Sequence, residues 1–117
     1  MPVWGVWEED GWHFGFSCGP RSRKARNLAT NPRAVVMSTT RWNALSVEGW
    51  VAPVVDASRQ TKWIDRYLAK YQPFSQDISA EFLHHNLMVE FVPERAFAVI
   101  EREADFSARA TRWVFGE

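Results

Sequence analysis

Apolar and polar residues alternate over residues 2–17 in two runs that are rich in aromatic side chains. The first run is PVWGVW at 2–7, the second is WHFGFS at 12–17, and the turn-like EEDG lies between them. A period of two is typical of a β-strand, and two such runs around a short Gly-containing segment are typical of a hairpin. We therefore expect a β-hairpin here.

Residues 18–32 change from alternation to helical spacing. The sequence CGPR at 18–21 ends the strand, and Ser22 is a residue type that caps the start of a helix. Apolar residues then recur at positions i, i+3 and i+4: Ala25, Leu28 and Ala29. Asn31 and Pro32 are typical of a helix end. The pattern predicts a short helix after Ser22 that buries one face.

Two further strand-like runs follow at 34–40 (AVVMSTT) and 44–55 (ALSVEGWVAPVV). In the second run one face carries Leu45, Val47 and Val51, and the other carries Ser46, Glu48 and Trp50. Gly49 inside this run indicates a bulge or a close approach of another backbone segment.

The remaining chain alternates between helical and strand patterns. An amphipathic helix is predicted at about 58–71 from the spacing of five residues: Trp63, Ile64, Tyr67, Leu68 and Tyr71. A short second helix is predicted after Ser79. LMVEFVPERAFAVI at 87–100 predicts two strands around Pro93, and ATRWVF at 110–115 predicts a last strand.

These elements predict a mainly β protein with peripheral helices. Six or seven strands joined by short connections favour an antiparallel barrel over a doubly wound α/β fold, which needs helices between successive strands. No linker or repeat divides the chain, so we expect residues 1–117 to form a single domain. The mouth of a small barrel is a natural place for a ligand.

Composition excludes several classes of function. The chain is 46% hydrophobic and 24% charged with a formal net charge of zero, which is typical of a soluble globular protein. A nucleic-acid or membrane-surface binder is usually basic, so we expect neither partner. No apolar run approaches the roughly 20 residues that cross a bilayer. Cys18 is the only cysteine, which favours a reducing cytoplasm.

One basic cluster lies at the predicted start of the first helix. Four cations fall within six residues: Arg21, Arg23, Lys24 and Arg26. The positive end of the helix dipole repels each of them by roughly 0.3–1 kcal/mol unless an anion is bound there. One interpretation is a phosphate site built from helix N–H groups, the Ser17 and Ser22 hydroxyls, Arg23 and Lys24. The alternative is a solvated basic helix face.

Other candidate chemistry is weaker. His84 and His85 are adjacent, and neighbouring positions of a helix point about 100° apart, so they do not chelate one ion. We expect no metal site. The sequence contains no Ser-His-Asp order, Walker loop or Rossmann fingerprint. No catalytic acid or base is predicted, and Cys18 is interpreted as a small residue at a strand end.

The segments PVWGVW and FSCGPRSRKARNLATNPRAVV resemble the flavin-binding split-barrel superfamily, the pyridoxamine 5′-phosphate oxidase-like proteins. The resemblance implies an antiparallel split β-barrel, a homodimer with cofactor sites along its interface, and FMN or the related deazaflavin coenzyme. It places the phosphate on Arg23 and Lys24, and it places the aromatic-then-hydroxyl strand end on Phe16 and Ser17.

The resemblance also implies two further groups of site residues. The strand flanking the isoalloxazine ring falls on residues that include Val3, Trp4 and Val6. Arg112 and Trp113 resemble C-terminal residues that lie near the ring or the substrate in many members. Members of the superfamily usually have a helix and a first strand before the PVW strand. We expect this chain, which starts at Met1, to be either a truncated or late-started form or a naturally shortened barrel. The additional Tyr and Arg that bind substrate phosphate in true pyridoxamine phosphate oxidases have no counterpart here, which disfavours vitamin B6 oxidation.

The expected function is therefore a flavin- or deazaflavin-dependent oxidoreductase that transfers a hydride to or from a small organic substrate. A non-catalytic flavin carrier or sensor on the same barrel is the alternative. A barrel that binds single-stranded nucleic acid is a third hypothesis, and the zero net charge argues against it.

Overall fold

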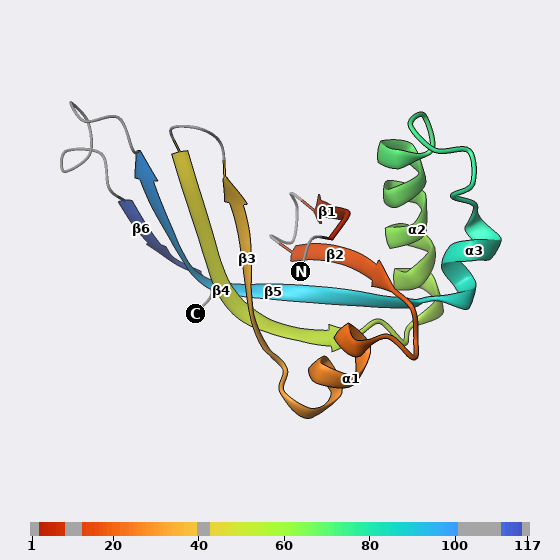
Figure 1. The fold of residues 1–117 in the computed structure, drawn as a ribbon, viewed down its shortest axis with the longest axis horizontal. Helices are drawn as coiled ribbons and strands as arrows, with labels where there is room; N and C mark the ends of the chain where they lie inside the picture. The colour runs from red at the N-terminus through yellow and green to blue at the C-terminus, as the bar shows by residue number, and fades with distance from the viewer. Residues whose placement is uncertain (1–2, 9–12, 40–42, 101–110, 116–117) are drawn as a thin grey trace.

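The computed structural model describes residues 3–8, 13–39, 43–100 and 111–115, and Figure 1 shows their arrangement. The strands in these parts of the chain are β1 (Gly5–Glu8), β2 (His13–Cys18), β3 (Arg33–Thr39), β4 (Asn43–Pro53), β5 (Leu87–Ile100) and β6 (Thr111–Val114). The helices are α1 (Arg23–Thr30), α2 (Ala57–Tyr71) and α3 (Ala80–His85). The predicted hairpin is confirmed, because β1 pairs antiparallel with β2. Its turn lies outside the described residues.

All six strands belong to one antiparallel sheet. Its order is β1-β2-β5-β4-β3, and β6 pairs with the far half of β5. Figure 1 shows β5 running along most of the length of the molecule, with β4 beside part of it, β6 beside one end of β5, and α2 and α3 beside the other end. In this order of five strands, β1 and β3 are the two edge strands.

Strand β5 is continuous, so the prediction of two separate strands around Pro93 is wrong. Glu48 pairs with Arg95 whereas Gly49 pairs with Pro93, which leaves Glu94 as an extra residue at a bulge. Pairing with β2 ends at Phe91 and pairing with β6 begins at Arg95. Bulges and strand stretches with a free side are the places where a sheet accommodates proline.

The close approach expected at Gly49 is confirmed. A Cβ built on this residue would lie 2.1 Å from the carbonyl oxygen of Val92. Any side chain here would collide with the backbone of β5, so only glycine fits at this position.

The sheet has a hydrophobic cluster on each face. One cluster joins β2, α1, β4 and β5 and is centred on Phe91, which is fully buried. The other lies beneath α2 and α3, and its members are Val6, Val54, Trp63, Ile64, Tyr67, Ile78, Leu83 and Met88. The amphipathic pattern predicted for α2 is confirmed, because Trp63, Ile64 and Tyr67 are its buried residues.

Side-chain caps define where the helices begin. The hydroxyl of Ser22 accepts a hydrogen bond from the backbone N–H of Ala25, and Asn31 ends α1, as predicted. Ser79 caps α3 in the same way, and Asp56 caps α2. Ala29 is exposed, so its assignment to the buried face of α1 is wrong. Among the described residues, no helix combines the length and apolar character needed to cross a membrane.

Candidate functional site

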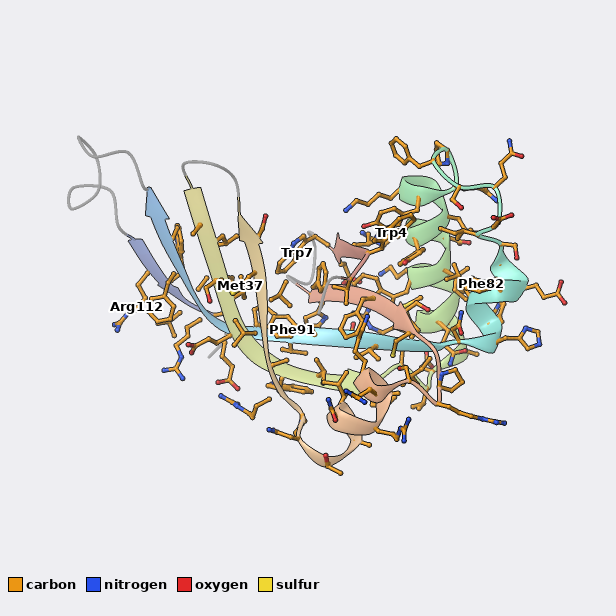
Figure 2. The ribbon with its side chains drawn as sticks, in the orientation of Figure 1. Trp4, Trp7, Met37, Phe82, Phe91 and Arg112 are labelled. Carbon is orange, nitrogen blue, oxygen red and sulfur yellow. The ribbon has the colours of Figure 1, made fainter. Side chains whose placement is uncertain are left out.

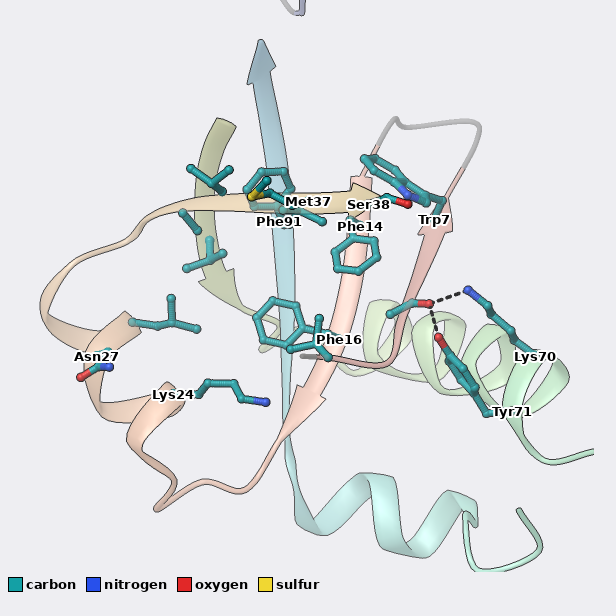
Figure 3. A pocket seen from close by; sticks show the side chains of 17 residues that line it. Trp7, Phe14, Phe16, Lys24, Asn27, Met37, Ser38, Lys70, Tyr71 and Phe91 are labelled. Carbon is teal, nitrogen blue, oxygen red and sulfur yellow. Dashed lines mark hydrogen bonds between the residues drawn. The ribbon is translucent and has the colours of Figure 1, made fainter. Parts of the chain in front are cut away.

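A cavity of about 690 Å³ lies between the two edge strands. Residues of β1, β2, α1, β3, β4, α2 and β5 line it, so every described strand except β6 contributes to the site (Figure 3). Cavities of this size are typical of sites for small organic ligands and cofactors. The sheet order explains its position, because β1 and β3 are not paired with one another in the described structure.

Aromatic and aliphatic side chains form the walls of the cavity. Trp7, Phe14 and Phe16 line it from the hairpin, with the Trp7 and Phe14 ring centroids 5.3 Å apart and those of Phe14 and Phe16 6.2 Å apart. Val35 and Met37 of β3 also line it, although 55% and 65% of their surfaces are exposed. Such walls suit a flat, largely apolar ligand.

Helix α1 brings Lys24 and Asn27 to one side of the cavity. Lys24 lies in the first turn of the helix, and this turn contains no acidic residue. The dipole of the helix adds partial positive charge to that of the Lys24 ammonium group. This corner of the site therefore favours an anion.

Helix α2 brings a second pair of polar side chains, Lys70 and Tyr71, to another side. Lys70 Nζ donates to the carbonyl oxygen of Gly5 at 2.8 Å, and Tyr71 Oη donates to the same oxygen at 2.7 Å. Trp4 stacks on the Tyr71 ring with centroids 5.0 Å apart. The helical pattern of the sequence did not predict this pair, because it assigned Tyr71 only to the buried face and gave Lys70 no role.

Three of the residues nominated from the sequence line the cavity, namely Val3, Phe16 and Lys24. Trp4 does not line it but is 52% exposed and packs on Tyr71. Val6 is buried in the cluster beneath α2, on the other side of the sheet from the cavity. Their roles toward a cofactor stay predictions.

The other nominated residues lie outside the cavity lining of the single chain. Ser22 caps α1, Arg23 is exposed, and Ser17 alternates with the cavity-lining Phe16 along β2. Arg112 and Trp113 are exposed on β6, and Figure 2 shows Arg112 at the opposite end of the molecule from Trp4. Within one chain, Lys24 therefore lies at the cavity, and Arg112 and Trp113 lie away from it.

A charged cluster lies on the α2 side of the sheet, away from the cavity. Arg59 Nε donates to Glu90 Oε1 at 2.7 Å, and Arg59 Nη2 lies 3.4 Å from Glu8 Oε1 and 2.9 Å from His13 Nδ1. Trp63 Nε1 also donates to Glu90, at 3.3 Å. Burial opposes ionisation of Glu90, but the hydrogen bond and charge of Arg59 outweigh it and lower the Glu90 pKa.

This cluster fastens the start of α2 to β1, β2 and β5. It holds the helix whose last residues, Lys70 and Tyr71, line the cavity. Within the ranges that the structure describes, no group of three or more His, Cys, Asp or Glu residues is arranged to hold a metal ion.

Comparisons of sequence find no relative: no protein-family model matches the chain, and no curated protein matches it significantly. Solved structures do match. A conserved hypothetical protein from Mycobacterium tuberculosis superposes with a TM-score of 0.69 and 16% identity, over 100% of this chain and 75% of that one.

Two other structures carry names that mention a ligand. A pyridoxamine 5′-phosphate oxidase-related, FMN binding protein from Nostoc punctiforme superposes with a TM-score of 0.60 and 11% identity, over 98% of this chain and 79% of that one. A heme binding protein from Mycobacterium smegmatis superposes with a TM-score of 0.66 and 13% identity, over 96% of this chain and 45% of that one. At these identities the comparison establishes the fold, and the chain has the antiparallel split-barrel fold of the pyridoxamine 5′-phosphate oxidase-like, FMN-binding proteins.

Proposed function

We propose that the cavity binds FMN and that the protein is an oxidoreductase, transferring a hydride between the flavin and a small organic substrate. The observation that carries the proposal is the combination of aromatic side chains, Trp7, Phe14 and Phe16, with Lys24 at a helix start, in one cavity between the edge strands. The deazaflavin coenzyme is the alternative occupant.

The residues present fit such a cofactor. Phe14 and Phe16 offer ring faces for an isoalloxazine, and Lys24 with the N-terminus of α1 offers charge and N–H donors for a phosphate. A cavity of about 690 Å³ falls within the usual range for ligands of this kind. Lys24 would hold the phosphate, and Asn27 lies one helical turn further along the same face.

FMN, when bound, supplies the site that accepts or donates the hydride. The chain's own residues would orient the ring and exclude water. The cavity lining that the structure describes contains no Asp, Glu, His or Cys side chain, and its ionisable groups are Lys24, Lys70 and Tyr71. None of the three is assigned a proton-transfer step here.

The proposal includes a homodimer with the cofactor near its interface. At the β1 edge, Lys70 and Tyr71 of the same chain already bind the Gly5 carbonyl. Strand β3 is the other edge, and its Val35 and Met37 are largely exposed beside the cavity. A second copy covering β3 would bury these side chains and close the cavity. We place the protein in the cytoplasm, since its one cysteine, Cys18, is buried and unpaired.

A non-catalytic carrier or sensor is the second candidate. The observation that favours it is that the same fold occurs in a protein named for heme binding. Turnover separates the two candidates, because a carrier binds flavin without passing electrons to a substrate.

The test begins with the purified protein and the small molecule that it releases on denaturation, identified by mass spectrometry. Recovery of FMN, or stoichiometric uptake of added FMN with a change in flavin absorption, supports the proposal. Reduction of the bound flavin followed by reoxidation with a panel of electron acceptors then distinguishes enzyme from carrier. Recovery of neither FMN nor deazaflavin, with no uptake of either, contradicts flavin binding.

A further inference from the structure

The cavity has two cationic sides that come from different helices. Lys24 reaches it from α1 and Lys70 from α2, and Figure 3 shows the two side chains on different sides of the cavity. They are the only charged side chains in the described lining, although the whole chain has equal numbers of acidic and basic residues. Two separated ammonium groups without a carboxylate favour two separated anionic groups in the cavity, whether these belong to one ligand or to two.

The Gly5 carbonyl explains how Lys70 and Tyr71 can bind a ligand without loss of the fold. This one oxygen accepts hydrogen bonds from both Lys70 Nζ and Tyr71 Oη. A carbonyl has two lone pairs, and an ammonium group has three N–H donors, of which this bond uses one. If Tyr71 turns its hydroxyl hydrogen toward a ligand, Gly5 therefore keeps the hydrogen bond from Lys70.

We propose that Lys70 and Tyr71 bind the carboxylate of an organic acid substrate, while Lys24 binds the phosphate of the cofactor. The inference rests on the proposed function, and it names the substrate class for the same site. A carboxylate accepts one hydrogen bond from the spare N–H groups of Lys70 and a second from the Tyr71 hydroxyl. The aromatic walls from Trp7 and Phe14 then contact the apolar part of the acid.

The position of Tyr71 supports the assignment. Its ring stacks on Trp4, and Lys70 Nζ lies 5.1 Å from the centroid of that ring. The stack holds the hydroxyl and the ammonium group near a common point, the Gly5 carbonyl at the cavity wall. Two donors that meet at one point suit the two oxygens of a carboxylate better than a neutral group with a single acceptor.

The experiment compares benzoate with benzamide, its neutral analogue of similar shape. Binding to the FMN-loaded protein is followed by the flavin spectrum, and binding to the flavin-free protein is followed by tryptophan fluorescence. We expect benzoate to bind about tenfold more tightly than benzamide, because it makes a charge-assisted hydrogen bond. Lys70→Met should remove this preference, and Tyr71→Phe, which keeps the ring on Trp4, should reduce it.

Two matched variants complete the design. Lys62→Met removes an exposed lysine from the same helix, outside the cavity lining, and should keep the benzoate preference. Lys24→Met should reduce the preference for FMN over riboflavin and leave the preference for benzoate over benzamide. Lys70→Met should do the reverse.

Each outcome separates this inference from the proposed function. Equal binding of benzoate and benzamide, or a benzoate preference that survives Lys70→Met, would overturn the carboxylate site whether or not FMN binds. If Lys70→Met weakens FMN and not benzoate, Lys70 serves the cofactor and the inference is wrong. A Lys70-dependent benzoate preference in a protein that takes up no flavin would contradict the proposed function and leave the carboxylate site standing.

Discussion

Gly15 lies directly under the indole ring of Trp63. A Cβ built on Gly15 would be 2.5 Å from Cε3 of Trp63, a distance to which non-bonded carbon atoms essentially never approach. Gly15 is in the middle of β2, between Val6 and Glu90 of the neighbouring strands, and Trp63 is 1% exposed. The missing side chain allows α2 to pack its largest residue onto the sheet.

Gly15→Ala should therefore destabilise the protein. The added methyl group has no space unless α2 moves, and overpacking of this kind typically costs about 1–3 kcal/mol. Chemical denaturation of parent and variant measures the difference. Gly19→Ala is the control, since a Cβ there meets only Ser22 Cβ at 3.9 Å. Equal destabilisation by the two substitutions would show that the contact with Trp63 is not the cause.

Local signals in the sequence were sufficient to predict the hairpin and the helices. Ser22 and Ser79 cap their helices as their positions predicted, because a cap depends only on residues a few positions away. The apolar spacing of α2 likewise identified the face that packs on the sheet. The antiparallel barrel class followed from the number and order of these elements.

Features that depend on distant residues were not predictable. Pro93 stops a strand by its local propensity, yet it lies inside β5 because the bulge opposite Gly49 accommodates it. Lys70 and Tyr71 became candidate site residues only through their contacts with Gly5, 65 and 66 positions away. A pattern along the chain contains no information about which side chain such an edge carbonyl will meet.

Lys24 and Arg23 provide a test of the phosphate site. Both were assigned to the phosphate from the resemblance, but only Lys24 lines the cavity, and Arg23 is exposed. Lys24→Ala should weaken FMN binding by about 1.5–3 kcal/mol, the range for a hydrogen bond to a charged group. Arg23→Ala should have a much smaller effect. Titration of FMN followed by quenching of its fluorescence measures both affinities, and equal affinity of the Lys24 variant and the parent would remove Lys24 from the site.

The Glu90 carboxylate should make the protein less stable in acid. Its pKa is held below the ordinary value of 4.5, despite burial, by Arg59, His13 and Trp63. A group with a lowered pKa in the folded state contributes its full stability above the unfolded pKa, and that contribution is lost as the pH falls through the folded pKa. The free energy of unfolding should therefore decrease as the pH drops below about 4.5.

Denaturation at about pH 6 and about pH 3.5 tests this expectation. Glu90→Gln should reduce the loss of stability between the two conditions, because the variant has no carboxylate to protonate at this position. Glu94→Gln is the comparison, since Arg33 lowers the Glu94 pKa in an exposed pair that salt screens. If Glu90→Gln and the parent lose the same stability in acid, the cluster around Arg59 does not determine the acid response.

Met37→Lys should dissociate the proposed homodimer. Met37 is 65% exposed on the edge strand β3 and lines the cavity, so a second copy that covers β3 would bury it. A lysine at the centre of such an interface would have to lose its hydration, which disfavours association. Sedimentation at micromolar protein should show a dimer for the parent and a shift toward monomer for the variant, with FMN affinity falling in parallel.

Val55→Lys is the control for the dimer prediction, at a position that is 86% exposed and outside the cavity lining, and it should leave both the dimer and the FMN affinity unchanged. A parent protein that is a stable monomer and holds FMN at full stoichiometry would refute both the dimer and the shared site.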